Sequence, residues 1–305
     1  MDTLEHLVTE QRNERTLDLS ELSIKEIIEI MNDEDGKVAG AVRQALPVIE
    51  LVTAEIVKAL EQGGRLIYIG AGTSGRLGVL DASECPPTFG VDYETVIALI
   101  AGGEGAFITA VEGAEDDEHQ AAIDLQNKQL TEKDILIGLA ASGRTPYVKG
   151  ALQYAKQLGV VTAAVTCNRN SILSEYADLA IEVEVGPEVL TGSTRLKAAT
   201  AQKMVLNMLT TAAMIKRGKV YQNLMIDLNV SNYKLRERAH SILMQATGTT
   251  AEEAEIKLVE AGNHVKTAIV MIEAGVSQSE ASRYLEETNG FVTKAIAQAR
   301  LELSR

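Results

Sequence analysis

The sequence predicts an α/β protein, with a doubly wound parallel sheet followed by a small C-terminal helical bundle. The main observation is a segment that occurs twice, at residues 67–76 and 135–144, each time as an apolar run followed by a small-residue turn that ends in Ser-Gly-Arg. Each copy is typical of a buried strand, a tight loop and a helix start. Further apolar runs alternate with helical patterns up to about residue 216. Such alternation predicts parallel strands covered by helices on both faces.

The elements up to the end of the sheet follow in order. Residues 1–35 are polar and charged and are predicted to form an arm, with a short amphipathic stretch at residues 23–31. A long helix is predicted at residues 37–62, because Val42, Ile49 and Ile56 recur near one face of it. Strands are predicted at residues 66–69, 95–100, 135–139, 160–166 and 179–185. Helices are predicted at residues 105–112, 117–130, 147–158 and 193–216.

After about residue 240 the strand patterns stop and short helical patterns follow. These helices are predicted at residues 250–261, 263–274, 278–288 and 290–302, separated by Gly262, Gly275 and Gly290. The pattern at residues 281–296 is similar to that of a ubiquitin-associated-type three-helix fold. We therefore expect an N-terminal arm and long helix at 1–56, a sheet domain at 57–220, a connecting segment at 221–240 and a helical bundle at 241–305.

The composition excludes several classes of partner. The chain of 305 residues has 43 acidic and 29 basic side chains, a net charge of −14, only 4% aromatic residues and no Trp. Such a surface repels nucleic acid and anionic membranes, and it offers few rings for stacking on bases. Cys85 and Cys167 are the only cysteines, and their spacing fits neither a disulfide framework nor a zinc site. The sequence shows neither a membrane-length apolar run nor a secretory signal, so we expect the cytoplasm.

Three loops rich in glycine and hydroxyl groups adjoin the predicted strands. Their candidate phosphate-binding residues are Gly72, Thr73, Ser74 and Gly75 in the first loop, Ser142, Gly143 and Thr145 in the second, and Ser193 and Thr194 in the third. Free N–H groups and hydroxyls at a helix start bind anions, and the helix dipole helps. A single loop of this kind is more simply explained by the turn and capping preferences of Gly and Ser. Three such loops favour a phosphate held from several sides.

Two better-known phosphate motifs do not fit the first loop. Residues 70–75 match G-x-G-x-x-G, but Asp92 and Glu94 precede the second strand, whereas a dinucleotide site needs an acidic residue at its end. A Walker A motif needs Lys and then Ser or Thr where this chain has Arg76 and Leu77. The loop is therefore better suited to a terminal phosphate.

Two glutamates are candidates for proton transfer. Glu84 shortly precedes Pro86-Pro87, and two consecutive prolines predict that the helix ends at Glu84. The helix dipole disfavours a carboxylate at that end, which suits a proton donor. Glu115 lies in the acidic run at residues 112–118. From the residues alone, an exposed helix-end glutamate and a solvated acidic loop that caps the next helix are the simpler explanations.

Several motifs occur together along nearly the whole chain. They are LVTEQRN at 7–13, IGAGTSGRLG at 69–78, DASECPPTFG at 81–90, AGG at 101–103, VEGAED at 111–116, GLAASGRTPY at 138–147, GSTRLK at 192–197 and NLM at 223–225. With these motifs the chain resembles the N-acetylmuramic acid 6-phosphate etherases, which carry a sugar isomerase (SIS) domain of flavodoxin-like fold. The ECPPT block is specific to that group. The GTSG loop is shared with other SIS proteins, including the glucokinase regulatory protein, which is not an enzyme.

The resemblance implies a reaction and the residues that perform it. The D-lactyl ether at C3 of N-acetylmuramic acid 6-phosphate is removed by elimination and hydration, giving N-acetylglucosamine 6-phosphate and D-lactate in cell-wall sugar recycling. The reaction needs neither a metal nor a redox cofactor. By position, the acid and base glutamates of the family match Glu84 and Glu115. We expect Glu84 to be the proton donor and Glu115 to be the base.

Two alternatives remain at this stage. An aldose–ketose isomerase would share the phosphate loops and proton abstraction at C2, but it would not need the ECPPT block. A non-catalytic sugar-phosphate sensor would need the loops alone, and the presence of both glutamates argues against it.

The spacing along one predicted helix raises the question of subunits. If Gly75 begins the helix and Glu84 ends it, they lie roughly 13–14 Å apart along its axis. A hexose 6-phosphate does not bridge that gap comfortably. Either the helix is shorter, or Glu84 serves a phosphate loop of another subunit. Because SIS proteins commonly form dimers with shared sites, we expect a homodimer with composite active sites.

Overall fold

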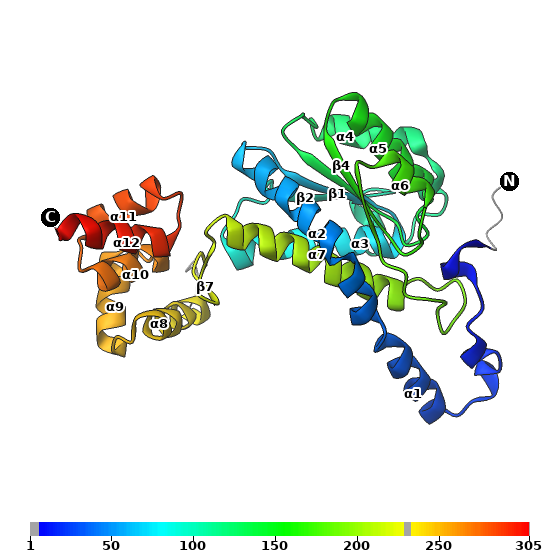
Figure 1. Ribbon diagram of the computed structural model, residues 1–305, viewed down its shortest axis with the longest axis horizontal. Coiled ribbons are helices and arrows are strands. Elements are labelled where there is room, and N and C mark those ends of the chain that lie inside the picture. The colour runs from blue at the N-terminus through cyan, green and yellow to red at the C-terminus, as the bar shows by residue number, and fades with distance from the viewer. Residues whose placement is uncertain (1–5, 229–232, 305) are drawn as a thin grey trace. The chain divides into compact units, whose positions relative to one another are not determined.

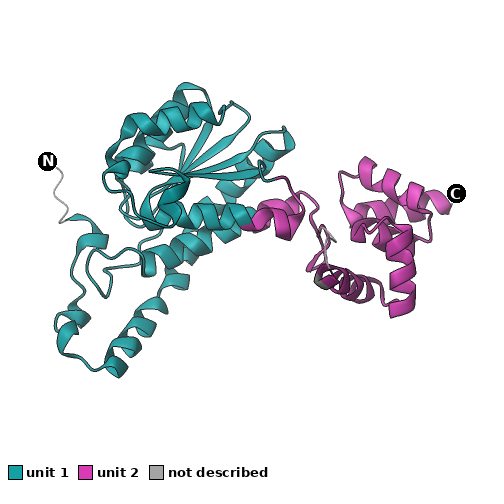
Figure 2. Ribbon diagram, turned by 180° about the vertical axis from the view of Figure 1, so that it is seen from behind, with its two compact units in different colours: residues 1–83, 93–210 teal, residues 84–92, 211–305 magenta. Residues whose placement is uncertain are grey.

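The chain forms two compact units in the computed structural model, which describes residues 6–228 and 233–304. The first unit comprises Met1–Ser83 and Tyr93–Thr210, and the second comprises Glu84–Asp92 and Thr211–Arg305 (Figure 2). Helices α3 (Gly72–Phe89) and α7 (Lys197–Lys216) therefore contribute residues to both units.

The first unit is built on a parallel sheet of five strands. The strand order is β2-β1-β3-β4-β5, and every pairing in it is parallel. The strands are β1 (Leu66–Gly70), β2 (Val96–Ile100), β3 (Ile135–Leu139), β4 (Val161–Thr166) and β5 (Leu179–Glu182). All residues of β1 and β3 are buried, as is typical of strands that are covered on both faces. The predicted α/β fold with a doubly wound parallel sheet is confirmed.

Helices cover both faces of this sheet (Figure 1). One layer consists of α4 (Glu118–Asn127), α5 (Pro146–Gln157) and the short α6 (Ile172–Tyr176). It packs on a core that includes Ile67, Ile69 and Leu136. The other layer contains α2 (Val38–Glu61), which contacts β1, β3 and β5. On that face Gly78 of α3 lies so close to Tyr68 that a Cβ atom would come 3.1 Å from the Cβ of Tyr68.

The N-terminal arm is a series of short helical turns. They are η2 (Val8–Glu10), η3 (Glu14–Thr16) and η4 (Leu19–Glu21), followed by α1 (Ile24–Asp35). Helix α1 begins where the amphipathic stretch was predicted, because Ser23 and Glu26 form a reciprocal capping box.

The second unit contains a hairpin and a helical bundle. The hairpin pairs β6 (Val220–Tyr221) with β7 (Leu224–Met225). The bundle consists of α8 (Tyr233–Thr247), α9 (Ala251–Glu260), α10 (Val265–Ala274), α11 (Gln278–Glu287) and α12 (Val292–Leu303). Its core includes Leu243, Leu258 and Ile269, all fully buried. The four predicted helices correspond to α9–α12. Helix α8 was not predicted, and it begins within the segment that was expected to connect the domains.

Two sequence predictions are wrong at loops that matter for the site. The helix predicted to end at Glu84 continues to Phe89, with Pro86 and Pro87 inside α3. Burial of Cys85 and Phe89 on one side of this last stretch favours the helix despite the two missing N–H donors. The helix predicted at 105–112 is only the short turn η5 (Glu104–Phe107). Left-handed glycines at 102 and 103 redirect the chain before it.

Smaller differences concern the last strand and the last sheet-domain helix. Strand β5 ends at Glu182, and α7 begins at Lys197. Among the described residues, we find no helix long and apolar enough to span a membrane.

Candidate functional site

The first two candidate phosphate loops follow neighbouring strands. Strand β1 pairs with β3 in a register that places Gly70 opposite Leu139, so the two loops leave the sheet at the same edge. Ligands of open parallel sheets bind at this carboxyl edge. The sequence repeat therefore corresponds to two loops that lie next to each other.

The first loop is the opening turn of α3. The helix begins at Gly72, and the N–H of Gly75 donates to the carbonyl of Ala71 at 3.0 Å. The preceding N–H groups of a helix have no partner within it, so they are available to an anion. A side chain at Gly75 would not fit, since a Cβ would come 2.8 Å from the Cγ1 of Ile100 and 2.9 Å from Gly70. Glycine here allows the loop to approach the strand closely.

Ser74 faces the protein interior in this structure. Its side chain is buried, and its hydroxyl donates to Oε1 of Gln202 at 2.8 Å. Gln202, on α7, donates in turn to the carbonyl of Val165 at the end of β4, at 3.4 Å. Ser74 therefore links three elements that meet at the carboxyl edge. The hydroxyl proton of Ser74 is engaged by Gln202 in this conformation, and no sequence pattern pointed to this partner.

The second loop is held in a left-handed turn. Gly143 has φ of +71°, and a Cβ there would lie 2.3 Å from the Cβ of Ser171. The side chain of Asn168 donates to the carbonyls of Ala141 and Ser142, both at 3.2 Å. Thr145 precedes α5, and its hydroxyl makes no capping hydrogen bond to that helix. Carbonyls are thus held on the protein side, while the start of α5 and the Thr145 hydroxyl remain for a ligand.

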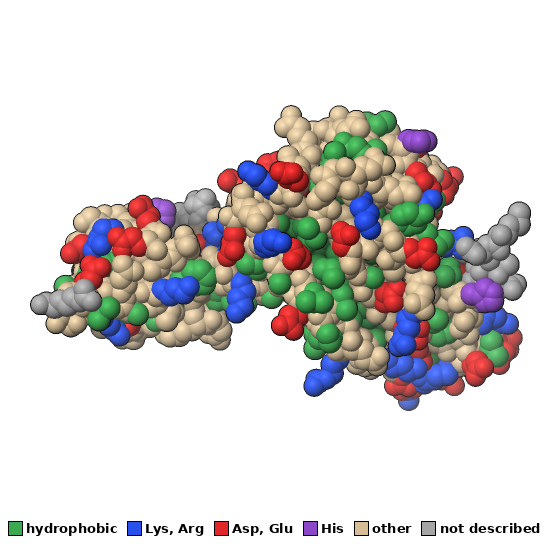
Figure 3. Space-filling view, turned by 45° about the horizontal axis from the view of Figure 1, so that its top comes forward, with side chains coloured by type: hydrophobic (Ala, Val, Ile, Leu, Met, Phe, Trp, Pro, Cys, Tyr) green, Lys and Arg blue, Asp and Glu red, His purple; other side chains and the backbone are tan. Residues whose placement is uncertain are grey.

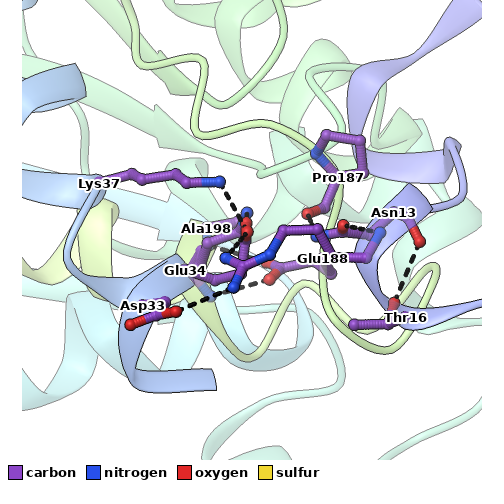
Figure 4. A network of polar contacts seen from close by, with 10 residues as sticks. Asn13, Thr16, Asp33, Glu34, Lys37, Pro187, Glu188 and Ala198 are labelled. Atoms are coloured by element: carbon purple, nitrogen blue, oxygen red, sulfur yellow. Dashed lines mark hydrogen bonds and ion pairs between the residues drawn. The ribbon is translucent and has the colours of Figure 1, made fainter. Parts of the chain in front are cut away.

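The third loop, which contains Ser193 and Thr194, is closed by a buried carboxylate. Glu188 accepts the N–H groups of Lys197 and Ala198 at 3.0 and 2.9 Å (Figure 4). Burial raises the pKa of Glu188, although these N–H groups act in the opposite direction. The first amides of α7 are therefore occupied by the protein itself. Ser193 and Thr194, both half-buried, are the groups of this loop that a phosphate could reach.

A buried ion pair fixes Lys197, the residue at which α7 begins after this loop. Nζ of Lys197 lies 2.6 Å from Oε2 of Glu34, and both side chains are almost completely buried. Arg15 and Lys37 bind the other oxygen of Glu34 at 3.1 and 2.6 Å. Burial alone would raise the pKa of Glu34, but these cations overcome it and lower the pKa to about 2.

Glu115 is exposed on a short turn that is anchored to α5. It lies in η6 (Ala114–Asp116), which follows the left-handed Gly113. The next residues fix the turn, because Glu118 forms an ion pair with Lys149 at 3.0 Å. The carbonyl of Glu118 also packs against Gly150, so closely that a Cβ added at Gly150 would come within 2.1 Å of the carbonyl oxygen. A hollow of about 490 Å³ adjoins the turn, lined by Gly113, Asp116, Asp117, Glu118 and His119.

Glu84 is exposed on α3, one turn before the helix ends. Pro86 and Pro87 cannot donate to the carbonyls of Ala82 and Ser83, so these oxygens flank Glu84 without their usual helix partners. Glu84 belongs to the second compact unit, whereas Glu115 and the three loops belong to the first. Among the described residues, we find no group of three or more His, Cys, Asp or Glu side chains placed to hold a metal ion.

Three residues that shape the site were not singled out from the sequence. They are Asn168, Glu188 and Gln202, all buried and all bonded to a candidate loop or to the residues beside it. Asn168 comes directly after the end of β4, and that position could have identified it. Glu188 and Gln202 carry no signal of that kind.

Comparison with known proteins agrees with this geometry. Residues 48–156 match the model of the glucokinase regulatory protein N-terminal SIS domain, and residues 109–212 match that of the SIS domain. The phosphoheptose isomerase of Neisseria gonorrhoeae has a similar fold, with a TM-score of 0.50 and 14% identity, over 63% of this chain and 98% of that one.

Two curated relatives are much more similar in sequence. A protein of Geobacillus sp. strain WCH70 is 57% identical over 96% of this chain and 99% of its own length. One of Bacillus subtilis strain 168 is 53% identical over 96% of both chains. Each carries the name N-acetylmuramic acid 6-phosphate etherase. At this identity over nearly the full length, the chain belongs to the N-acetylmuramic acid 6-phosphate etherase family.

Proposed function

We propose that this protein cleaves the D-lactyl ether of N-acetylmuramic acid 6-phosphate, giving N-acetylglucosamine 6-phosphate and D-lactate. The observation that carries the proposal is identity of 53–57% with curated etherases over about 96% of the chain. The geometry is consistent with a sugar phosphate, since hydroxyl-bearing loops gather at the carboxyl edge of the sheet. The enzyme is then a carbon–oxygen lyase.

The chemistry of the ether determines which groups are needed. An ether oxygen is a poor leaving group in a direct displacement. Opening of the sugar ring to the aldehyde makes the C2 proton acidic, so that a carboxylate can remove it. The C3–O bond then breaks, a proton donor delivers its proton to the departing lactate oxygen, and a double bond forms between C2 and C3. Addition of water across this bond gives the product. Two carboxyl groups and a fixed phosphate suffice for these proton transfers.

Within this scheme we assign Glu115 as the base at C2 and Glu84 as the proton donor to lactate. Both side chains are exposed and therefore accessible to a substrate. The donor role of Glu84 follows the prediction from the sequence, which placed it near the C-terminal end of its helix. The phosphate is assigned to the first two loops, with Ser193 and Thr194 of the third.

We further propose that the active sites are shared within a homodimer. Helix α3 runs without interruption from Gly72 to Phe89. Glu84 and the first loop are therefore separated by the full length of helix that lies between them. One chain therefore does not easily present both to one hexose 6-phosphate. Large apolar side chains are exposed on the first unit, among them Ile24 and Ile28 on α1 and Leu46 and Leu51 on α2. Figure 3 shows hydrophobic side chains exposed among charged ones on one face. Burial of such side chains favours association.

The activity is tested by release of D-lactate from N-acetylmuramic acid 6-phosphate. The unphosphorylated sugar is the matched control and should react far more slowly. An aldose–ketose isomerase would interconvert sugar phosphates without releasing lactate, and a sensor would bind product without turnover. Either result would refute the proposed reaction. Because sugar phosphates are charged and do not cross membranes unaided, we place the reaction in the cytoplasm.

The shared site is tested by mixing two inactive variants. Glu84→Ala removes the proton donor, and Thr73→Arg blocks the first loop at a half-buried position. If the sites are shared, each mixed dimer contains one site in which both defects are absent, and activity returns. If mixed dimers form and stay inactive, Glu84 and Thr73 act within one chain.

A further inference from the structure

The N-terminal segment Val8–Thr16 carries polar side chains that are unusually well buried for an arm. Thr9 is 1% exposed, and Asn13 and Thr16 are below 10%. Buried polar groups are stable only when they are hydrogen-bonded, so their partners show what the segment is built to hold. The segment overlaps the LVTEQRN motif at residues 7–13.

The partner of Thr9 is Asn168, the residue that holds the second phosphate loop. Asn168 is 2% exposed, and the two hydrogens of its amide nitrogen are shared among three acceptors, the Thr9 hydroxyl at 3.0 Å and the carbonyls of Ala141 and Ser142. The N–H of Thr9 donates to Oδ1 of Asn168 at 3.4 Å. Asn168 therefore lies between the N-terminal segment on one side and the loop on the other.

The direction of these bonds has a consequence for the orientation of the Asn168 amide. A backbone N–H can only donate, so the oxygen of Asn168 must face Thr9. The amide nitrogen is then placed between the Thr9 hydroxyl and the loop carbonyls, and these carbonyls can only accept. A carbonyl oxygen repels a phosphate, whereas an N–H group attracts it. By fixing both carbonyls on the protein side, Asn168 keeps the second loop in the form that an anion needs.

The same segment also contacts the start of the third loop directly, and it binds Glu34, the residue that holds Lys197 at the other end of that loop (Figure 4). Nδ2 of Asn13 donates to the carbonyl of Pro187 at 3.2 Å, directly before Glu188. Arg15 binds Glu34, the partner of Lys197, at the other end. The N-terminal segment is thus bonded to the residues that fix the second loop and to those that fix the third.

We propose that the N-terminal segment Val8–Thr16 is a positioning element of the phosphate site, acting mainly through the Thr9–Asn168 pair. Neither residue is a catalytic residue, because each acts through the loop carbonyls. The inference rests on the proposed function for the identity of the ligand. It requires only that the loops bind a phosphate group.

The test uses the full chain and compares closely matched variants. Thr9→Val removes the hydroxyl and keeps the shape of the side chain, whereas Thr9→Ser keeps the hydroxyl and removes a methyl group. Thr53→Val is the control, because the half-buried Thr53 hydroxyl donates to the carbonyl of Ile49 within its own helix. Affinities for N-acetylglucosamine 6-phosphate and for inorganic phosphate are measured by calorimetry, and the melting temperature of each variant is recorded.

Thr9→Val keeps the backbone N–H of Thr9 but removes one acceptor of the Asn168 amide, so we expect it to weaken both affinities by about 5- to 10-fold, the effect of one neutral hydrogen bond. Thr9→Ser should stay within about 3-fold of the wild type, and Thr53→Val should lose stability without losing affinity. Asn168→Asp replaces the donating amide nitrogen with an oxygen that faces the loop carbonyls. Because two acceptors repel each other, this variant should weaken binding further. If Thr9→Val lowers the melting temperature but binds both ligands like the wild type, the segment is only structural and the inference is wrong.

Failure of the proposed reaction and failure of this inference would give different results. A wild-type protein that binds both phosphates but releases no lactate would refute the etherase reaction, and the variants would still decide this inference. A wild-type protein that binds neither phosphate would refute the inference itself.

Discussion

Gly143 offers the sharpest test of how the second candidate phosphate loop is built. Its φ of +71° lies in the left-handed region, and an added Cβ would lie 2.3 Å from Cβ and 2.6 Å from Oγ of Ser171. Left-handed backbone costs a residue with a side chain about 1–2 kcal/mol. Forcing an extra carbon into a packed site costs roughly 1–3 kcal/mol more. Gly143→Ala should therefore cost about 2–5 kcal/mol.

Part of this cost should appear as lost binding. The Gly143 carbonyl accepts the N–H of Leu173 at 2.9 Å, so the loop cannot shift away from Ser171 without breaking that bond. A shifted loop also misplaces the amides and the Ser142 hydroxyl. We expect the affinity for N-acetylglucosamine 6-phosphate, measured by calorimetry, to fall by about 30-fold or more, since about 2 kcal/mol corresponds to that factor.

Gly159→Ala is the matched control for the backbone term. Gly159 has φ of +74°, and a Cβ there would meet no atom within 4 Å. It should cost only the left-handed strain, about 1–2 kcal/mol of unfolding free energy in urea, and leave binding unchanged.

A double-mutant cycle isolates the steric term. Ser171→Gly removes the atoms that would clash, at the expense of the cap that Ser171 provides to α6. In the Ser171→Gly background, Gly143→Ala should lower the unfolding free energy by less than it does in the wild type, and the difference is the steric part of its cost. If Gly143→Ala costs no more than Gly159→Ala, or if the two changes are additive, the close approach to Ser171 does not shape the loop.

Three further predictions follow from named contacts. Ser142→Ala should weaken product binding by about 1–3 kcal/mol with little loss of stability. Ser74→Ala should lower the unfolding free energy by about 1–3 kcal/mol, because it leaves buried Gln202 without its donor, and it should weaken product binding indirectly, because Gln202 no longer holds the opening turn of α3. Calorimetry measures binding and urea unfolding measures stability, and unchanged affinity in both variants would contradict the phosphate assignment. Glu84→Gln and Glu115→Gln should keep product binding but lose about 10²-fold or more in lactate release. Only Glu115→Gln should also lose exchange of the C2 proton of product in deuterated water, and wild-type exchange in that variant would exclude Glu115 as the base. A carboxyl whose pKa is lowered to about 2 from an ordinary 4.5 stabilises the fold above pH 4.5, and this contribution is lost as the pH falls toward 2. From pH 5 to 2 the unfolding free energy of the wild type should therefore fall by about 3 kcal/mol more than that of Glu34→Gln, and parallel curves would contradict the buried ion pair.

The strands, the loops between them and most of the C-terminal helices could be predicted from the amino-acid sequence. Apolar β-branched runs such as residues 66–69 and 135–139 predict buried strands because a parallel sheet buries both faces of each strand. The repeated Ser-Gly turns locate two loops at one edge, because parallel strands end on the same side. Glycines such as Gly262 and Gly275 mark helix ends, since they adopt left-handed backbone without strain. These features are local, and local patterns encode them.

Other features were decided by contacts that are distant in sequence. Pro86 and Pro87 locally predict a helix stop, yet burial of Cys85 and Phe89 keeps α3 helical to its last turn. Helix α8 has a polar sequence and forms against the core of the bundle, which no local pattern shows.

The same limit applies to the site. Ser74 meets Gln202 across 128 residues, and Thr9 meets Asn168 across 159. A hydrogen-bond partner that far along the chain leaves no periodic signal in the sequence. Glycine, serine and glutamate in the motifs therefore predict the chemistry of the candidate site from the sequence, and that assignment stays a prediction. The buried side chains that hold its loops in place became visible in the folded protein, because those partners meet only after the chain has folded.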